Sequence, residues 1–157
     1  MSEATPDPRP DLVLRPVGPG DLDALTALVR AYYAYDQHDW DGATQVEALR
    51  QLCEGTAYAR CFFILLEGQR IGYVSASYGF SIEVGGLDFF LDEVFLDAAW
   101  QGRGLGRLVL ALIEDEVRAL GGLRLCLEAE LHNPRAAHLY ATSGYAEHER
   151  RLLSKVL

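Results

Sequence analysis

Apolar residues recur along this chain with two different periods, and these periods divide its first third into a predicted strand and two predicted helices. Apolar and polar residues alternate in DLVLRPV, which predicts a strand over 11–17. Leucine and valine then recur every three or four residues, which predicts a helix over 21–35 and, after an aromatic and acidic stretch, a shorter one over 43–53. Each predicted element has one apolar face that must pack against a neighbour.

The middle of the chain reads mainly as strands. Two apolar runs flank EGQR, in which Gly68 suits a tight turn, and predict a β-hairpin over 61–80. A run rich in aromatic and branched residues predicts a further strand over 86–97. Because three strands follow one another without a helix between them, we expect them to pair antiparallel.

Helices and strands alternate in the last third. A continuous apolar stripe predicts a helix over 105–120, and a buried strand follows over 123–131. The stretch NPRAAHLYATSG predicts another helix, capped by Asn133, and EHERRLLSKVL predicts a final strand over 147–157. The strand–helix–strand order favours a parallel pair with a right-handed crossover. The elements together predict an α/β (α+β) fold in which helices cover a mixed sheet.

Length and composition narrow the class of protein. The 157 residues suit one domain, which we expect over 11–157 after a polar, proline-rich lead over 1–10 that we expect to be disordered. The net charge of −9 argues against nucleic-acid binding and is compatible with a cationic substrate. The three cysteines have no paired spacing and are interpreted as reduced thiols. The first residues of the sequence lack the features of a signal peptide. No apolar run reaches the length of a membrane span, about 18 residues. These features predict a cytoplasmic protein.

Three glycines stand close together in AWQGRGLG, between the predicted strand over 86–97 and the helix over 105–120. Glycine permits close backbone approach, and a helix N-terminus offers unpaired N–H groups and a favourable dipole, so such a turn suits an anion. Arg103 and Arg107 favour a phosphate, whereas the glycines alone are also explained by a tight, closely packed turn. The spacing fits neither the dinucleotide pattern G-x-G-x-x-G nor a Walker motif, which needs Gly-Lys-Ser/Thr.

The spacing Gln101-x-x-Gly104-x-Gly106 resembles the acyl-CoA pyrophosphate loop of the GNAT family of N-acetyltransferases. The preceding LDEVFLDAAW is similar to the strand that leads into that loop, and residues 133–145 resemble the family's Asn-x-x-Ala-x-x-Leu-Tyr-x-x-x-Gly-Phe/Tyr signature. With LRPV and EGQRIGYV, the resemblance extends over most of the chain. The stretch YGFSIEVGGLDFFLDEVFLD is loosely similar to the family subgroup that acetylates small diamines and related amines.

The resemblance implies the GNAT fold, a mixed and strongly twisted sheet of six to seven strands flanked by about four helices and opened between its fourth and fifth strands to admit acetyl-CoA. It implies that backbone N–H groups of the glycine loop hold the pyrophosphate and that the fourth strand pairs with the pantetheine amides. The residues that it places at the cofactor are Val94, Phe95, Leu96, Gln101, Gly102, Arg103, Gly104, Leu105, Gly106, Arg107, Asn133, Arg135 and Tyr140. No metal is expected.

Direct acetyl transfer to an amine needs a proton donor for the departing thiolate and a group that leaves the amine neutral. The resemblance gives the first role to Tyr140, whose phenol is protonated at neutral pH. It places a catalytic glutamate where this sequence has Asp92, followed by Glu93. Adjacent residues of a strand point to opposite faces, so we expect one carboxylate to face the acceptor, with a bridging water where Asp92 is too short. Glu128 and Glu130 stay open as alternatives.

The acceptor is expected among aromatic and acidic residues that follow the first helix, a combination that suits a cation. The residues predicted to bind it are Tyr33, Asp36, Trp40 and Tyr78. A solvated acidic loop or a dimer surface is the alternative interpretation of this stretch. The sequence thus favours an acetyl-CoA-dependent N-acetyltransferase that acts on the primary amine of a small molecule, such as a polyamine or an amino acid.

Two other functions and one partner stay open. Acetylation of a protein N-terminus or of lysine is one alternative, and a non-catalytic acyl-CoA-binding module is the other. A homodimer is expected if the closing strand leaves a sheet edge open for a second copy.

Overall fold

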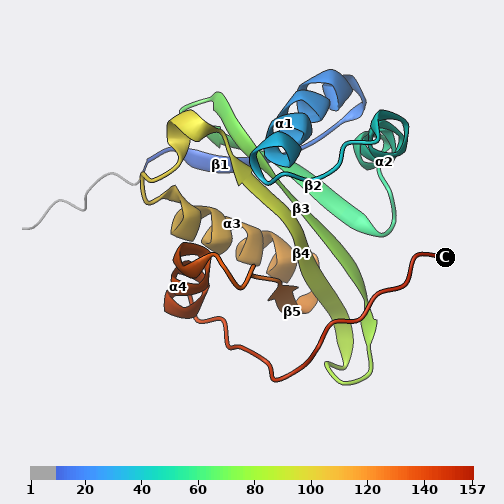
Figure 1. Cartoon of the computed structure of the whole chain (residues 1–157), viewed down its shortest axis with the longest axis vertical. Helices are drawn as coiled ribbons and strands as arrows, with labels where there is room; N and C mark the ends of the chain where they lie inside the picture. The colour runs from blue at the N-terminus through green and yellow to red at the C-terminus, as the bar shows by residue number, and fades with distance from the viewer. Residues whose placement is uncertain (1–9) are drawn as a thin grey trace, which may run out of the picture.

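The computed structural model describes residues 10–157, in which five strands form one sheet between layers of helices (Figure 1). The strands lie in chain order: β1 (Leu12–Pro16), β2 (Ala59–Leu66), β3 (Gln69–Ser81), β4 (Gly86–Leu96) and β5 (Gly122–Leu127). The helices are α1 (Leu22–Tyr35), α2 (Gly42–Glu54), α3 (Leu105–Ala119) and α4 (Pro134–Thr142), with short 3-10 turns at Pro19–Asp21 and Ala98–Trp100. The predicted disordered lead over 1–10 lies, except for Pro10, outside the described residues.

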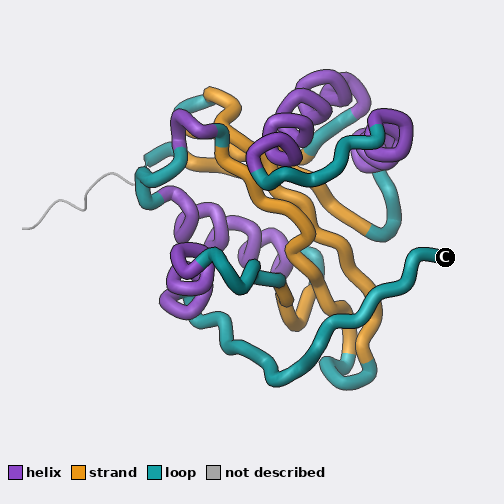
Figure 2. The backbone as a smooth tube through the Cα atoms, in the orientation of Figure 1, coloured by secondary structure: helices purple, strands orange, loops and turns teal. Residues whose placement is uncertain are grey.

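Helices α1 and α2 cover one face of the sheet, and α3 and α4 cover the other (Figures 1 and 2). Strand β2 supplies residues to both layers, because successive side chains of a strand point to opposite faces. Phe62 and Ile64 pack on the α3 side, whereas Phe63 packs on the side of α1 and α2. Burial on both faces explains why the sequence of this strand is apolar throughout.

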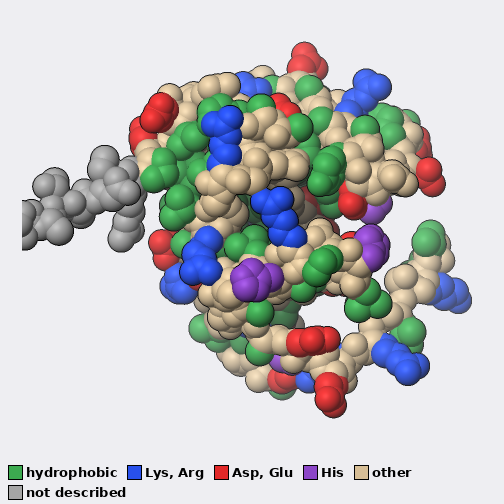
Figure 3. Space-filling view, turned by 60° about the vertical axis from the view of Figure 1, so that its left-hand side comes forward, with side chains coloured by type: hydrophobic (Ala, Val, Ile, Leu, Met, Phe, Trp, Pro, Cys, Tyr) green, Lys and Arg blue, Asp and Glu red, His purple; other side chains and the backbone are tan. Residues whose placement is uncertain are grey.

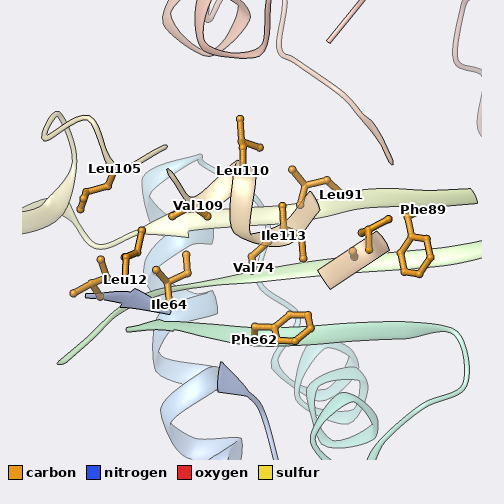
Figure 4. Packing of buried hydrophobic residues seen from close by; sticks show 13 residues of the cluster. Leu12, Phe62, Ile64, Val74, Phe89, Leu91, Leu105, Val109, Leu110 and Ile113 are labelled. Atoms are coloured by element: carbon orange, nitrogen blue, oxygen red, sulfur yellow. The ribbon is translucent and has the colours of Figure 1, made fainter. Parts of the chain in front are cut away.

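The larger core lies between the sheet and α3, as Figure 4 shows. Val109, Leu110 and Ile113 recur at helical spacing along α3, and they pack with Val74 of β3 and Leu91 of β4. Full burial of such a side chain stabilises the fold by about 1.5–3 kcal/mol. This packing fixes α3 across the sheet and so decides where its N-terminus lies relative to the end of β4.

Strands β1 to β4 pair antiparallel, and β5 pairs parallel with β4, which confirms the predicted pairing. The pairing of β4 with β5 extends from Leu87 to Leu91. Strand β4 then continues to Leu96 beside β3. The two strands therefore part after Leu91, and within residues 10–157 no strand pairs with the β5 side of residues 92–96.

The prediction of six to seven strands is wrong for the described chain, which has five. The segment 147–157, predicted as the final strand, is neither strand nor helix, and the strand predicted over 123–131 ends at Leu127. Arg150 Nη2 lies 3.2 Å from Glu83 Oε1 in the turn between β3 and β4, so the segment passes this turn and does not run along β5 (Figure 2). A strand needs a hydrogen-bonded neighbour, and this path provides none.

The described part of the chain contains no disulfide and no helix that is long and apolar enough to cross a membrane. Cys53 and Cys61 are buried thiols, and Cys126 is half-buried. Burial raises the pKa of the Cys61 thiol to about 12, so this thiol is protonated and unreactive at neutral pH.

Candidate active site

The regular pairing of β4 with β3 is interrupted at Asp92. Leu91 lies opposite Ala76, and Glu93 lies opposite the preceding residue, Ser75, so that Asp92 has no partner of its own. Such an extra residue is a β-bulge, which bends a strand and redirects its side chains. The bulge occurs at the point where β5 parts from β4.

The bulge turns two carboxylates toward the same face. Leu91 and Val94 both pack on the α3 side, although a spacing of three would place them on opposite faces of a regular strand. The two residues between them, Asp92 and Glu93, therefore both face α1. The prediction that they point to opposite faces is wrong, because it assumed an alternation that the bulge interrupts.

Glu93 is held by two tyrosine hydroxyls from different elements. Tyr73 of β3 donates to Oε2 at 2.7 Å, and Tyr33 of α1 donates to Oε1 at 3.1 Å. Burial raises the pKa of Glu93 above its ordinary value, and the nearby charge of Asp92 adds to this rise, while the two hydroxyls oppose it. The carboxylate is thus fixed in orientation and binds a proton more readily than an exposed glutamate.

Asp92 is the more open of the two carboxylates. It is exposed to solvent, yet the surrounding protein desolvates it enough to raise its pKa. Burial, followed by the charge of Glu93, raises the pKa of Tyr33 to about 12, and Asp92 contributes to this rise. Two adjacent carboxylates with raised pKa values are suited to accept a proton or to bind an ammonium ion.

Aromatic rings from the end of α1 and the loop after it lie beside Glu93. The Tyr33 ring meets Trp40 edge to face at 5.6 Å between centroids, and it meets His38 at 5.5 Å. His38 Nε2 in turn lies 2.7 Å from Asp36 Oδ2. Three of the four predicted acceptor residues are therefore gathered here, and rings beside carboxylates favour a cation.

Tyr78, the fourth predicted acceptor residue, lies apart from this group. Its ring stacks on Phe89 at 4.7 Å between centroids, and the Arg60 guanidinium lies over it at 5.4 Å. Phe89 belongs to the core on the α3 side. Tyr78 and Tyr33 are therefore on opposite faces of the sheet.

The glycine loop connects the end of β4 to the start of α3. Gly102 and Gly104 have φ values of 73° and 75°, a left-handed conformation that disfavours any residue with a Cβ, and Gly104 directly precedes α3. Gln101 Nε2 donates to the Leu96 carbonyl at 2.8 Å, so this side chain braces the loop against β4. The first N–H groups of α3 are thereby presented close to the unpaired edge of β4.

Gly106 lacks a side chain for a different reason. A Cβ there would lie 2.9 Å from Cδ2 of Leu139, so glycine allows α3 and α4 to approach closely. Arg103 stacks over the Trp100 ring at 4.7 Å, and Arg107 is exposed in the first turn of α3. Figure 3 shows basic side chains on this side of the molecule. Cations at a helix N-terminus favour an anionic ligand that offsets their charge.

Residues of α4 complete this region. Asn133 caps the helix as predicted, because its Oδ1 accepts from a backbone N–H of the first turn at 3.1 Å. The Arg135 guanidinium lies at the loop, 3.4 Å from where a Cβ of Gly102 would stand. Tyr140 is half-buried on the α3 side, with its ring 6.0 Å from that of Tyr145, and burial raises its pKa. Its phenol is therefore protonated at neutral pH.

Tyr73 is a residue of this site that the sequence analysis missed. In the sequence it lies in an apolar strand run, where a tyrosine reads as a core residue, and its ring is indeed buried. Its hydroxyl reaches Glu93 only because β3 pairs with β4 in this register. The one signal in the sequence was that a buried tyrosine hydroxyl needs a partner.

The chain is also similar to known sequences. Residues 23–145 match the family model described as the acetyltransferase (GNAT) family. A stretch of 57 residues is 39% identical to an uncharacterized N-acetyltransferase of Bacillus subtilis, YdgE. That match covers 36% of each protein, so this chain spans about a third of that relative.

Solved structures extend the likeness to the whole fold. An integron cassette protein from the mobile metagenome of Cole Harbour Salt Marsh, HFX_CASS3, has a TM-score of 0.79 at 26% identity, over 92% of this chain and 90% of that chain. The aminoglycoside N-acetyltransferase AAC(6')-Iy, solved in complex with CoA, has a TM-score of 0.72 at 16% identity, over 98% and 99% of the two chains. Because the family model covers most of its length and the fold agrees, this chain belongs to the GNAT family of acetyltransferases.

Proposed function

We propose that this acetyltransferase transfers an acetyl group from acetyl-CoA to the primary amine of a small molecule, such as a polyamine or an amino acid. The observation that carries the proposal is the bulge in β4, which turns Asp92 and Glu93 toward the aromatic end of α1 where β4 and β5 part. Carboxylates beside aromatic rings favour a cationic acceptor, and the net charge of −9 favours its approach. In this proposal residues 11–157 act as one domain in the cytoplasm.

The donor side of the proposal rests on the loop before α3. Apart from its chain neighbours, no described residue has an atom within 4 Å of where a Cβ of Gly104 would stand, so there is space for a ligand beside the start of α3. In the proposal the pyrophosphate accepts hydrogen bonds from backbone N–H groups of Arg103, Gly104, Leu105, Gly106 and Arg107. The CoA bound to AAC(6')-Iy, which shares the fold, supports this assignment.

The unpaired edge of β4 is suited to the rest of the donor. Residues 94–96 have a strand partner on one side, so their backbone groups on the other side, apart from the Leu96 carbonyl that accepts from Gln101, are available to the pantetheine amides. Asn133 and Arg135 approach the donor from α4, the first through its side-chain amide and the second as a cation. Gln101 contributes by bracing the loop rather than by touching the donor.

The proposed chemistry is direct attack by the amine. Glu93, fixed by Tyr33 and Tyr73, orients the amine, and Asp92 accepts its proton through a bridging water. The amine nitrogen then bonds to the thioester carbon, the carbon–sulfur bond breaks, and the nitrogen releases its second proton to solvent. Tyr140 gives its proton to the departing sulfur and regains one from solvent. The products are the acetylated amine and CoA.

A thiol-release assay with acetyl-CoA and a panel of polyamines, amino acids, amino sugars and peptides tests the acceptor class. We expect turnover with the small amines and the highest kcat/KM for acceptors that carry a second cationic group. Turnover confined to peptides would instead indicate a protein acetyltransferase. Tight acetyl-CoA binding without turnover would indicate a non-catalytic module.

Replacement of Tyr140 tests the proton donor. We expect Tyr140→Phe to lower kcat by about 10²–10⁴-fold, because general acid catalysis contributes about that much. Tyr58→Phe is the control, since Tyr58 is exposed in the loop before β2. Full activity of Tyr140→Phe would remove this residue from the mechanism.

A further inference from the structure

Phe90 of β4 is a large aromatic side chain that belongs to neither core of the described chain. Its neighbour Phe89 is buried on the α3 side, and successive strand residues point to opposite faces, so Phe90 points to the face that carries α1 and α2. The core on that face includes Phe63 and Phe95 but not Phe90, which is half-buried. The ring is therefore available to a ligand on this face of the sheet.

The residues beside Phe90 across the sheet are small. Ser77 of β3 lies opposite Phe90 on one side, and Cys126 of β5 lies opposite it on the other. Ala59 of β2 lies opposite Ser77 in turn. Side chains directly opposite one another on neighbouring strands share a face, so the phenyl ring is the one large side chain in this row.

The face is open beyond this row. Gly79 follows Ser77 as the next residue of β3 on this face, and apart from its chain neighbours no described residue has an atom within 4 Å of where its Cβ would stand. Strand β2 begins at Ala59, so no residue of β2 lies beside Gly79. Strands β3 and β4 extend past α1 and α2 here (Figure 1). We call Phe90, Ser77, Gly79 and Cys126 together the Phe90 surface.

The Phe90 surface adjoins the proposed active site. Ser75 of β3 lies opposite Glu93, and Ser77, two residues further on, lies opposite Phe90. Two residues of a strand span about 7 Å, so the ring lies about that far along the sheet from the Glu93 row. A small amine bound at the carboxylates is long enough to reach it.

The opposite direction along β4 is closed. Both oxygens of Glu93 accept hydrogen bonds, Oε1 from Tyr33 and Oε2 from Tyr73. Phe95, the next residue on this face, is 6% exposed and belongs to the core under α1. An acceptor with its amine at the carboxylates therefore meets packed core on the side of Phe95 and free surface on the side of Phe90.

The Phe90 surface carries no free charge. At its far end Arg124 donates to Asp88 through Nε at 3.0 Å and through Nη2 at 2.7 Å, so these two charges satisfy each other. Burial raises the pKa of the Cys126 thiol, so this thiol is uncharged at neutral pH. An uncharged surface that contains an aromatic ring favours an apolar group over a charged or strongly hydrated one.

We propose that Phe90 is a specificity-determining residue, whose ring holds the apolar body of an acceptor with its primary amine at Asp92 and Glu93. The proposal rests on the proposed function and selects within it: among amines of equal charge, the site favours those with an apolar chain or ring within about 7 Å of the amine. Each methylene buried against the ring strengthens binding by about two- to fourfold, the lower value applying to a chain covered on one side.

Propylamine and hexylamine test the proposal, because they carry the same charge and differ by three methylenes. We expect kcat/KM to be about tenfold higher for hexylamine with the unchanged chain, and within about twofold for the two amines with Phe90→Ala. Phe80→Ala is the matched control, because Phe80 is an exposed ring near the end of β3. This control should keep the tenfold preference.

A second variant keeps the ring and covers it. Ser77→Leu places a larger side chain directly beside Phe90, so we expect it to lower kcat/KM for hexylamine to about that for propylamine and to leave propylamine unchanged. This variant decides the question if Phe90→Ala fails to fold by circular dichroism. A preference for hexylamine that survives either folded variant overturns the proposal, since another surface would then hold the chain.

Calorimetry of the two amines with the CoA-bound chain separates this proposal from the proposed function. If no amine is acetylated, the proposed function fails, yet tighter binding of hexylamine that is lost in Phe90→Ala would still support the assignment of Phe90. Equal affinity for the two amines with the unchanged chain, or no binding of either, would overturn it.

Discussion

Replacing Tyr73 by phenylalanine isolates the effect of one buried hydroxyl on Glu93. The hydroxyl donates to Oε2 at 2.7 Å from a ring that is 1% exposed, so phenylalanine fills the same space and only the hydrogen bond is lost. A hydrogen bond to a charged group contributes about 1.5–3 kcal/mol, against about 0.5–1.5 kcal/mol for a neutral pair. Removing it therefore disfavours the charged carboxylate by about 1 kcal/mol more than the neutral acid, which raises the pKa of Glu93 further.

The pH dependence of stability follows from the direction of this change. The folded-state pKa of Glu93 lies above its unfolded value, so its contribution to stability is fully present below the unfolded pKa and is lost as the pH rises through the folded pKa. Without the Tyr73 hydroxyl this loss becomes larger. We expect the free energy of unfolding of Tyr73→Phe to fall below that of the unchanged chain by about 2 kcal/mol at about pH 8, and by about 1 kcal/mol at about pH 4.

Urea unfolding at the two pH values measures the loss of stability. The pH profile of kcat/KM measures the rise in the pKa of Glu93. We expect the acid limb of that profile to move to higher pH, because a carboxylate that must be charged is then protonated more readily. Tyr145→Phe is the matched control, since its hydroxyl donates to a different carboxylate, Glu114, at 3.0 Å. An unchanged profile in Tyr73→Phe, or an equal shift in Tyr145→Phe, would refute the reasoning.

Three further predictions concern the bulge, the loop and the core. Burial raises the pKa of Asp92, so Asp92→Asn should melt at a higher temperature than the unchanged chain at neutral pH, and the difference should vanish below the unfolded pKa of about 3.9; a pH-independent difference would contradict this. Gly104→Ala strains a left-handed residue by about 1–2 kcal/mol and should weaken acetyl-CoA binding in calorimetry, whereas Gly20→Ala, at an open position, should not. Phe63→Ala should lower the free energy of unfolding by about 3–5 kcal/mol, and a loss under about 1 kcal/mol would show that the core on the α1 side refills the cavity.

Local patterns in the sequence were enough to predict most helices and strands and the glycine loop before α3. Helical spacing of leucine and valine, the cap at Asn133 and the glycines at 102 and 104 each depend on residues a few positions apart. The motif spacing around Gln101, together with the motifs before the loop and over 133–145, was also enough to identify the family that the comparisons then showed. Gly106 was read as part of the same loop, yet its close neighbour is Leu139, some thirty residues on, which no local pattern reveals.

The sequence by itself determined where most helices and strands form and which family the chain joins, because periodicity, caps and turns are set by near neighbours. The tertiary structure alone decided that Asp92 is the extra residue of a bulge, since that depends on how β4 aligns with a separate strand. It also decided that Glu93 meets Tyr73 and Tyr33, and that the segment 147–157 does not form a strand beside β5. These outcomes depend on hydrogen bonds between distant parts of the chain, whose partners exist only once the sheet and its helices have packed.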